Sequence, residues 1–297
     1  MATFKTPIIT LPYDSFTARA SATEQQSYTE HLEHGGVLFL PNLGFSLSPD
    51  EKRFLSPDWS DGKAKNIYLR GNDRTIRGAK GNADDLMAMS ALIERYATGT
   101  QQLISHLLPS YANHAKPANT SLRCIEASGR KTSWRKDDSR LHADAFPSKP
   151  TQGERILRVF TNVNPYGKPR VWKIGEPFSE MAKKFIHKVP RYSRTQAKLL
   201  HLLSITKSYR GEYDHTMLHL HDLIKADADY QHNAPQMTFE FSANSTWIVY
   251  SDQVLHAVLS GQYMMEQTLH LPPDQLDYPD ASPQKVIEKI LNRNISL

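Results

Sequence analysis

Four short apolar segments near the C-terminal end place the strongest limit on how this chain can fold. They read PQMTFEFS, STWIVYSD, VLHAVLSG and YMMEQTLHLP within residues 235–272, and polar or glycine-containing turns separate them. Segments of this length, rich in β-branched and aromatic residues and bounded by turn residues, are typical of β-strands. We therefore expect four strands joined as a meander, in a sheet that must bury its apolar face against another layer.

Further strand and helix patterns lie upstream of this region. The segment 21–34 is expected to be a helix that ends at Gly35 and Gly36 and leads into an apolar strand, VLFL, at 37–40. A second helix is expected from about Asp84 to Pro109, because its apolar residues recur at steps of three and four. Strand patterns begin again at Thr120 and at Glu154 in the sequence.

The order of these segments predicts a single α+β domain over residues 1–297, with an antiparallel barrel or sandwich supported by helices. An apolar fraction of 39% and a charged fraction of 23% are ordinary for a chain that buries a large core. The expected parts are an N-terminal extension of helices and strands, a strand-rich core with a helical insert, and a C-terminal helix. Their predicted ranges are 1–118, 119–272 with the insert at 176–232, and 273–297.

The single cysteine and the absence of long apolar runs bear on the cellular compartment. Cys124 cannot form an intramolecular disulfide, and a metal cluster of several thiolates is excluded. The start of the sequence, MATFKTPIITLPYDSF, lacks the basic and long apolar regions of a signal peptide. We expect a cytoplasmic protein.

The formal net charge of +5 is unevenly distributed. Basic residues gather at 63–80, at 130–140 and at 168–198, the last with nine Lys or Arg against two Glu. Such stretches favour anionic partners, including phosphorylated ligands, an anionic membrane surface or nucleic acid, and a solvated basic face is the alternative.

His142 and Asp144 form an H-x-D pair in the segment RLHADAFPS. Residues two apart on a strand point to the same face, so both side chains can reach one metal ion. A second histidine would complete the two-histidine, one-carboxylate set that leaves positions of Fe(II) open for a chelating cosubstrate and dioxygen. His256 in YSDQVLHAVLSGQ is the best third ligand, because it lies within a strand pattern.

Other histidines compete with this assignment, since the chain has 13. On an expected helix, His215 and His219 are four residues apart, and His219 and His221 form an H-x-H pair that could bind zinc. No glutamate follows His215 directly, as the H-E-x-x-H motif of zinc proteases requires. We interpret these three as a polar helix face or a wall of the substrate site.

Two segments, RLHADAFPSKPTQGERILRVFTNVNP and STWIVYSDQVLHAVLSGQYMMEQT, resemble the Kdo 3-hydroxylase family. Members of this family are Fe(II)- and 2-oxoglutarate-dependent dioxygenases that act on the Kdo sugar of lipopolysaccharide. The resemblance spans most of the chain and implies a double-stranded β-helix, also called a jelly-roll or cupin-like core. It also implies that His142, Asp144 and His256 are the iron ligands, with 2-oxoglutarate and O2 as cosubstrates.

The residue that binds the distal carboxylate of 2-oxoglutarate departs from the common pattern. Many related enzymes carry an arginine on the strand after the distal histidine, where this chain has Glu266 and Gln267. A glutamate there is expected to repel a dianion, so we predict that the cation comes from the strand after the H-x-D pair. Arg158, flanked by apolar residues, is predicted to point inward and bind the carboxylate, with a buried salt bridge as the alternative, whereas Arg155 is expected to face solvent. Weaker candidates for polar support are Gln267, Ser260, Thr161 and Asn162.

The resemblance implies hydroxylation at C3 of a Kdo residue on a lipid A precursor, giving D-glycero-D-talo-oct-2-ulosonic acid, succinate and CO2. We expect Arg135, Lys136 and Arg140 to lie nearest the sugar carboxylate, and the basic stretches to dock on the anionic inner leaflet without insertion. Neither a nucleic-acid partner nor a protein partner is expected. Two alternatives remain: a non-catalytic cupin-type module that binds metal or sugar, and a 2-oxoglutarate hydroxylase of another polyanion.

Overall fold

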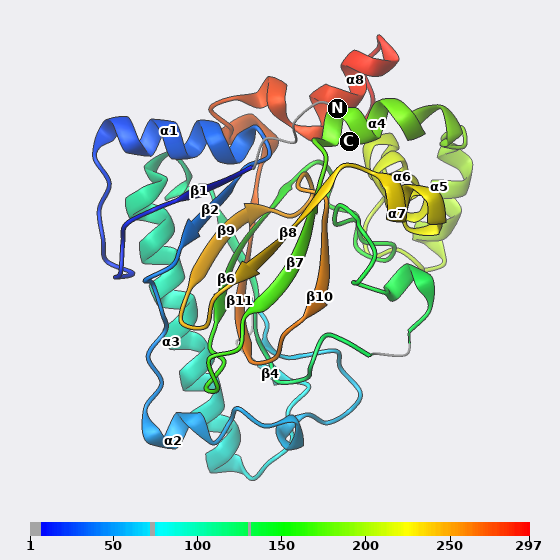
Figure 1. The fold of residues 1–297 in the computed structure, drawn as a ribbon. Coiled ribbons are helices and arrows are strands. Elements are labelled where there is room, and N and C mark those ends of the chain that lie inside the picture. Colours follow the sequence, from blue (N-terminus) through cyan, green and yellow to red (C-terminus); the bar gives the residue numbers. More distant parts are fainter. Residues whose placement is uncertain (1–6, 72–74, 130–131) are drawn as a thin grey trace.

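Two facing β-sheets form the centre of the molecule (Figure 1). The computed structural model describes residues 7–71, 75–129 and 132–297. The large sheet has the strand order β1-β2-β9-β6-β11-β5-β3-β4, and the small sheet has the order β10-β7-β8. The strand bounds are Ile8–Thr10 (β1), Val37–Leu40 (β2), Ile67–Leu69 (β3), Ile76–Arg77 (β4), Lys116–Arg123 (β5), Arg155–Asn162 (β6), Arg170–Gly175 (β7), Gln236–Phe241 (β8), Thr246–Tyr250 (β9), His256–Ser260 (β10) and Met264–Leu271 (β11).

Aromatic side chains from both sheets fill the space between them. Trp247 of β9 stacks on Phe241 of β8 with ring centroids 4.1 Å apart, and Trp172 of β7 meets Trp247 edge to face. All three rings are buried together with Phe160 of β6. This aromatic core holds the two sheets of a jelly-roll against each other, as the resemblance implied.

The predicted meander of the last four strands is wrong. Strand β8 pairs with β7, β9 with β2 and β6, β10 with β7, and β11 with β5 and β6. Successive strands therefore alternate between the two sheets and do not pair with their neighbours in the chain. Strand β7 was not predicted, because its sequence, RVWKIG, alternates apolar residues with Lys and Arg only briefly.

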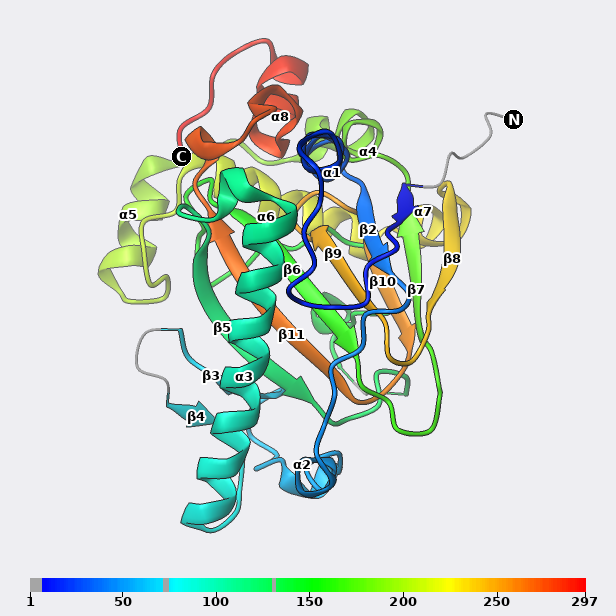
Figure 2. The same ribbon diagram turned by 90° about the vertical axis from the view of Figure 1, so that its left-hand side faces the viewer.

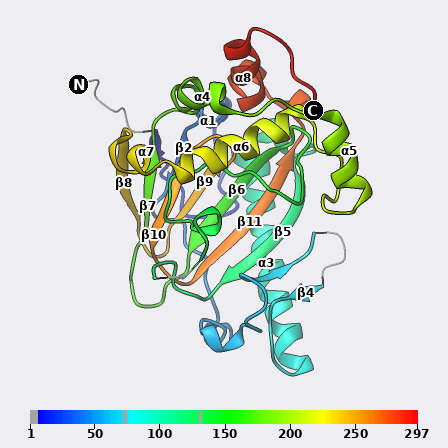
Figure 3. The same ribbon diagram turned by 90° about the vertical axis from the view of Figure 1, so that its right-hand side faces the viewer.

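Helices cover the outer faces. Their bounds are Ala22–Glu33 (α1), Pro49–Lys52 (α2), Ala83–Leu107 (α3), Phe178–Phe185 (α4), Arg194–Leu202 (α5), Glu212–Ala226 (α6), Ala228–Asn233 (α7) and Pro283–Leu291 (α8). Helices α1 and α3 lie across the outer face of the large sheet (Figure 2). Helices α4, α6 and α8 share a separate apolar cluster on the other side, where α6 crosses in front of the sheets (Figure 3).

Helix α3 shows how the sequence determines one of these layers. Asn82 and Asp85 form a reciprocal capping box at its N-terminus. Its apolar stripe, which includes Met89 and Leu103, is fully buried against the sheet. The hydroxyl of Tyr96 donates to the Val159 carbonyl at 3.2 Å, so the helix is also tied to β6 by a buried hydrogen bond.

The N-terminal region contributes strands to the sheet as well as packing on it. Strands β1 and β2 extend one edge beside β9, and β3 and β4 extend the other edge beside β5. Helices α4 to α7 lie between β7 and β8, in the range where a helical insert was predicted. Among the described residues, no helix is long and apolar enough to span a bilayer.

Candidate metal centre

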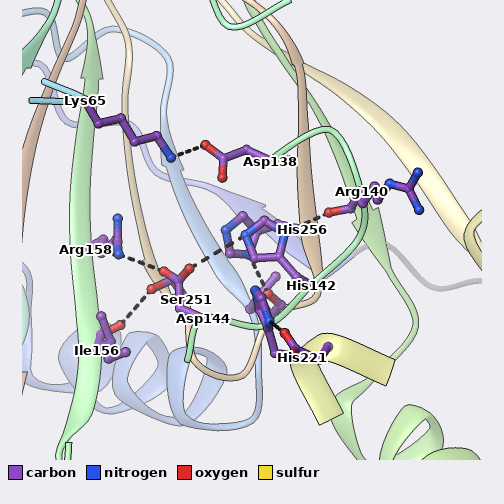
Figure 4. A network of polar contacts seen from close by, with 12 residues as sticks. Lys65, Asp138, Arg140, His142, Asp144, Ile156, Arg158, His221, Ser251 and His256 are labelled. Carbon is purple, nitrogen blue, oxygen red and sulfur yellow. Dashed lines mark hydrogen bonds and ion pairs between the residues drawn. The ribbon is translucent and has the colours of Figure 1, made fainter. Parts of the chain in front are cut away.

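The main chains of His142 and His256 pair directly with each other. The His142 amide donates to the His256 carbonyl at 3.0 Å, and the His256 amide donates to the His142 carbonyl at 2.9 Å. This antiparallel bridge joins the H-x-D segment to the first residue of β10, and both imidazoles lie beside the Asp144 carboxylate (Figure 4). One ligand atom from each of His142, Asp144 and His256 lies within 4.8 Å of the other two. The structure thus brings the three predicted iron ligands together.

The imidazoles are oriented so that one nitrogen of each remains free for a metal. The Nδ1 atom of His142 contacts the Arg140 carbonyl at 2.7 Å, and the Nδ1 atom of His256 contacts the Val254 carbonyl at 2.8 Å. A carbonyl only accepts, so each Nδ1 carries the proton and each Nε2 presents a lone pair. Burial, and then the adjacent His256, hold the pKa of His142 well below its usual range, and burial also lowers the pKa of His256. Both rings are therefore neutral.

The third residue, Asp144, is held as an anion. Its carboxylate lies 2.8 Å from a terminal guanidinium nitrogen of Arg158 and 3.7 Å from His142 Nε2. Burial alone would raise the pKa of Asp144, but Arg158, the two histidines and a hydrogen bond from Ser251 together outweigh it, so the pKa lies well below its usual range. Two neutral imidazoles and one carboxylate on a single face fit Fe(II), and their Nε2 and carboxylate atoms are the donors that would hold it.

Alternating charges continue from Asp144 across the inner face of the large sheet. Arg158 of β6 lies 2.6 Å from Glu266 of β11, and Arg123 of β5 forms a second ion pair with Glu266. The expectation that Glu266 repels a dianion is therefore wrong, because two guanidinium groups neutralise it. The Nε atoms of Arg123 and Arg158 are buried without a hydrogen-bond partner, so two donors remain for an anionic ligand on this face.

Arg155, expected in solvent, is fully buried. It lies 2.6 Å from both Asp252 and Gln253, and its guanidinium group lies over the ring of Tyr250 at 4.0 Å. The expectation failed because β6 is covered on both faces, so neither side of the strand is exposed to water.

The weaker cosubstrate candidates lie in different places. Gln267 and Thr161 point to the outer face of the large sheet, opposite to Glu266 and Arg158, so their predicted role was wrong. Gln267 bonds to Thr120 at 2.6 Å, and Thr161 lies 3.0 Å from the Tyr96 hydroxyl.

Asn162 and Ser260 lie on or beside inward positions. The amide of Asn162 is fully used, since it donates to the carbonyls of Lys168 and Phe241 and accepts from the Asn164 amide. Its role as polar support for the cosubstrate stays a prediction. Ser260 follows a bulge at the end of β10, and its role stays a prediction.

The three residues predicted near the substrate immediately precede the metal segment. Arg135 pairs with Asp222 of α6 at 3.0 Å, Lys136 is exposed, and Arg140 donates to the Lys225 carbonyl at 2.8 Å. Their contact with substrate stays a prediction. Within the basic stretches, Arg74, Arg130 and Lys131 lie outside the described residues.

Helix α6 brings His221, which the sequence assigned to a polar helix face or a wall of the substrate site, to the metal centre. The ring centroid of His221 lies 5.6 Å from that of His142, and its Nδ1 atom lies 2.9 Å from Asp222 (Figure 4). The rings of His215 and His219 adjoin each other at 4.4 Å, but within the described ranges only His142, Asp144 and His256 form a metal-binding group. The H-x-H pattern drew attention to His221, but spacing alone could not decide which side chain of this long insert lies beside the metal ligands.

Comparison with known proteins identifies a matching family and similar solved structures. A family model described as 3-deoxy-D-manno-oct-2-ulosonic acid (Kdo) hydroxylase matches residues 15–294. This chain is similar to the Kdo hydroxylase KdoO, a non-heme Fe(II) α-ketoglutarate-dependent dioxygenase, in its crystal structure with α-ketoglutarate and Fe(III). The two sequences are 47% identical. The match covers 98% of this chain and 97% of that chain, with a TM-score of 0.94. The cobalt(II) complex of KdoO is 48% identical over the same shares, with a TM-score of 0.95. No curated protein matches the chain.

Proposed function

The chain belongs to the Kdo hydroxylase family, and from this premise we propose that it hydroxylates C3 of a Kdo residue carried on a lipid A precursor. Its cosubstrates are 2-oxoglutarate and dioxygen, and its metal is Fe(II). The single observation that carries the proposal is the closed group of His142, Asp144 and His256, with both Nε2 lone pairs free.

The protein's own part in the reaction is to hold the metal and to orient the groups that bind it. His142 and His256 are the neutral nitrogen ligands, and Asp144 is the anionic oxygen ligand, which Arg158 keeps deprotonated. Bound Fe(II) supplies a centre at which dioxygen oxidises 2-oxoglutarate to succinate and CO2, with one oxygen atom going to the substrate carbon. The ring of Trp172 stacks on His256 at 5.0 Å and keeps water away from that ligand.

Arg158 is the proposed partner of the distal carboxylate of 2-oxoglutarate. Its guanidinium group lies beside Asp144, and its Nε–H is buried without a partner. Arg123, on the neighbouring side of Glu266, has an unpartnered Nε–H as well. A guanidinium group suits a carboxylate because it can donate two parallel hydrogen bonds.

The sugar is proposed to enter from the side of the segment that precedes His142. Arg135, Lys136 and Arg140 are the proposed contacts for the sugar carboxylate, since this segment leads directly into the metal ligands. The basic stretches are proposed to associate with the anionic inner leaflet, which places the enzyme at the cytoplasmic face of the inner membrane.

Succinate release tests the proposal. The protein is loaded with Fe(II) without oxygen, mixed with 2-oxoglutarate and Kdo-lipid A, and exposed to air. We expect succinate, and a lipid product with one added oxygen atom at C3 of Kdo by mass spectrometry and NMR. The His142→Ala variant should give neither product, whereas His114→Ala, which removes an exposed histidine away from the metal centre, should behave as the wild type.

Three results would contradict the proposal. Succinate formed equally without the sugar, or with DNA, RNA or peptide in its place, would remove Kdo as the substrate. Tight metal binding without any succinate would favour the non-catalytic module.

A further inference from the structure

Helix α5 and the turn after it expose an unusual number of aliphatic side chains. The exposed fractions are 53% for Leu199, 80% for Leu202, 59% for Leu203 and 55% for Ile205. These four, which we call the apolar tip, are four of the seven large apolar residues exposed in the described chain, and the other three lie apart at Met87, Tyr166 and Leu297. Single exposed apolar residues need no explanation, but a contiguous group indicates a contact surface.

The apolar tip is surrounded by positive charge. Arg191, Arg194, Lys198 and Lys207 flank it, and the sequence contains no Asp or Glu between Glu180 and Glu212. All four basic residues are exposed, and none forms an ion pair with another described residue. A second copy of the chain would bring like charges together, whereas an anionic surface would complement them.

The base of the tip is held firmly by main-chain contacts. The amides of Ile205 and Thr206 donate to the Leu200 carbonyl at 3.0 and 3.3 Å, and the Thr206 side chain is buried. The amide of Lys207 donates to the Ser148 carbonyl at 2.9 Å, in the loop that follows the metal ligand Asp144. In Figure 3, α5 projects from the edge of the fold beside α6. The exposed leucines are thus presented on a fixed support next to the metal segment.

We propose that the apolar tip inserts its four aliphatic side chains into the interface of an anionic bilayer, while the four flanking cations contact lipid phosphates. This arrangement of apolar residues ringed by Lys and Arg is typical of segments that lie in a membrane interface. It differs from the sequence-based expectation of docking without insertion. The inference deepens the proposed function, because it identifies the element that brings the metal centre to a lipid-borne sugar.

Vesicle flotation tests this inference with the full chain. The wild type should float with phosphatidylethanolamine vesicles that contain phosphatidylglycerol, and much less with vesicles that contain phosphatidylcholine instead. The Leu202→Gln/Leu203→Gln variant should bind the anionic vesicles at least roughly tenfold more weakly, because two buried leucines are lost from the interface. Met87→Gln, which removes an equally exposed apolar residue on α3, should bind as the wild type.

A second pair of variants separates insertion from charge. Tryptophan fluorescence of Leu202→Trp should shift to the blue on anionic vesicles, because the indole leaves water. Lys198→Glu/Lys207→Glu should weaken binding at low salt and reduce the salt dependence of the remaining binding.

Several outcomes would overturn the inference: undiminished binding of Leu202→Gln/Leu203→Gln, an equal loss with Met87→Gln, or an unshifted Leu202→Trp spectrum. A wild-type dimer in solution that this double variant dissociates would show that the tip binds a second copy instead. Turnover of a deacylated, soluble Kdo saccharide should be the same for wild type and variants. Failure of the wild type in that assay would count against the proposed function and not against the tip.

Discussion

At the scale of single residues, the inner face of the large sheet carries a row of alternating buried charges. Asp144, Arg158, Glu266 and Arg123 follow one another from the metal centre toward β5. Each charge has an opposite neighbour, so the row is tolerated in a place where a single ion is strongly disfavoured. The same row keeps the guanidinium group of Arg158 beside the metal ligand Asp144.

Glu266 is the member of this row whose loss is most readily measured. Glu266→Gln leaves Arg123 and Arg158 without their shared counter-ion, and we expect the free energy of unfolding to fall by about 3–5 kcal/mol. Urea denaturation of the metal-free protein measures this change. Lys116→Gln, which breaks the exposed Lys116–Glu154 pair, should change stability by less than about 0.5 kcal/mol. Equal effects of the two substitutions would show that the row is not buried.

Metal affinity tests whether His256 is a metal ligand. Calorimetry with cobalt(II) should show that His256→Ala binds more than about 100-fold more weakly, because loss of a ligand exceeds the 10- to 100-fold effect of losing a ligand's partner. His219→Ala removes a histidine of α6 outside the group and should bind cobalt(II) as the wild type. Unchanged affinity of His256→Ala would exclude it from the site.

The sequence predicted the three clustered residues at the metal centre and the inward-pointing Arg158, but not the ion pairs that link Arg158 to Glu266 and Arg123. An H-x-D pair with a histidine in a later strand is a local pattern that can be read directly. Arg123 and Glu266 become partners only through the register of β5 and β11, which no spacing reveals. Gln267 and Thr161 failed for the related reason that neighbours on a strand face opposite sides.

At the scale of elements, helix α3 owes its position to one apolar stripe. Met89 is fully buried, whereas Met87, two residues earlier, is 68% exposed. We expect Met89→Ala to lower the free energy of unfolding by about 2–5 kcal/mol through cavity formation. Met87→Ala should change it by less than about 0.5 kcal/mol. Thermal or urea unfolding of the two variants makes the comparison, and equal losses would contradict the packing described for α3.

Elements with local signals were predicted well, and those that depend on distant partners were not. Helices α1 and α3 begin and end within a few residues of the expected positions, because caps, Gly and Pro mark their ends. The pairing of β8 to β11 was wrong, because in a jelly-roll each strand finds its partner far along the chain. Strand β7 was missed although it lies at the centre of the small sheet.

At the scale of the whole molecule, Cys124 offers a probe of global unfolding. It is 3% exposed, and burial raises the pKa of its thiol to about 12. The thiolate, which is the reactive form, is therefore scarce in the folded chain at pH 8. We expect labelling by iodoacetamide to be slow without denaturant and to accelerate with urea in parallel with the loss of circular dichroism. Rapid labelling of the native protein would show that β5 opens locally.

The bridge between His142 and His256 has a consequence for the growing polypeptide. The H-x-D segment leaves the ribosome long before β10 does, so a partly synthesised chain offers one histidine and one carboxylate but no partner for their main chain. Only closure of the jelly-roll supplies the second imidazole and the two hydrogen bonds that fix the first. An unfinished or misfolded chain consequently lacks the complete ligand set, and oxygen chemistry is confined to molecules that have finished folding.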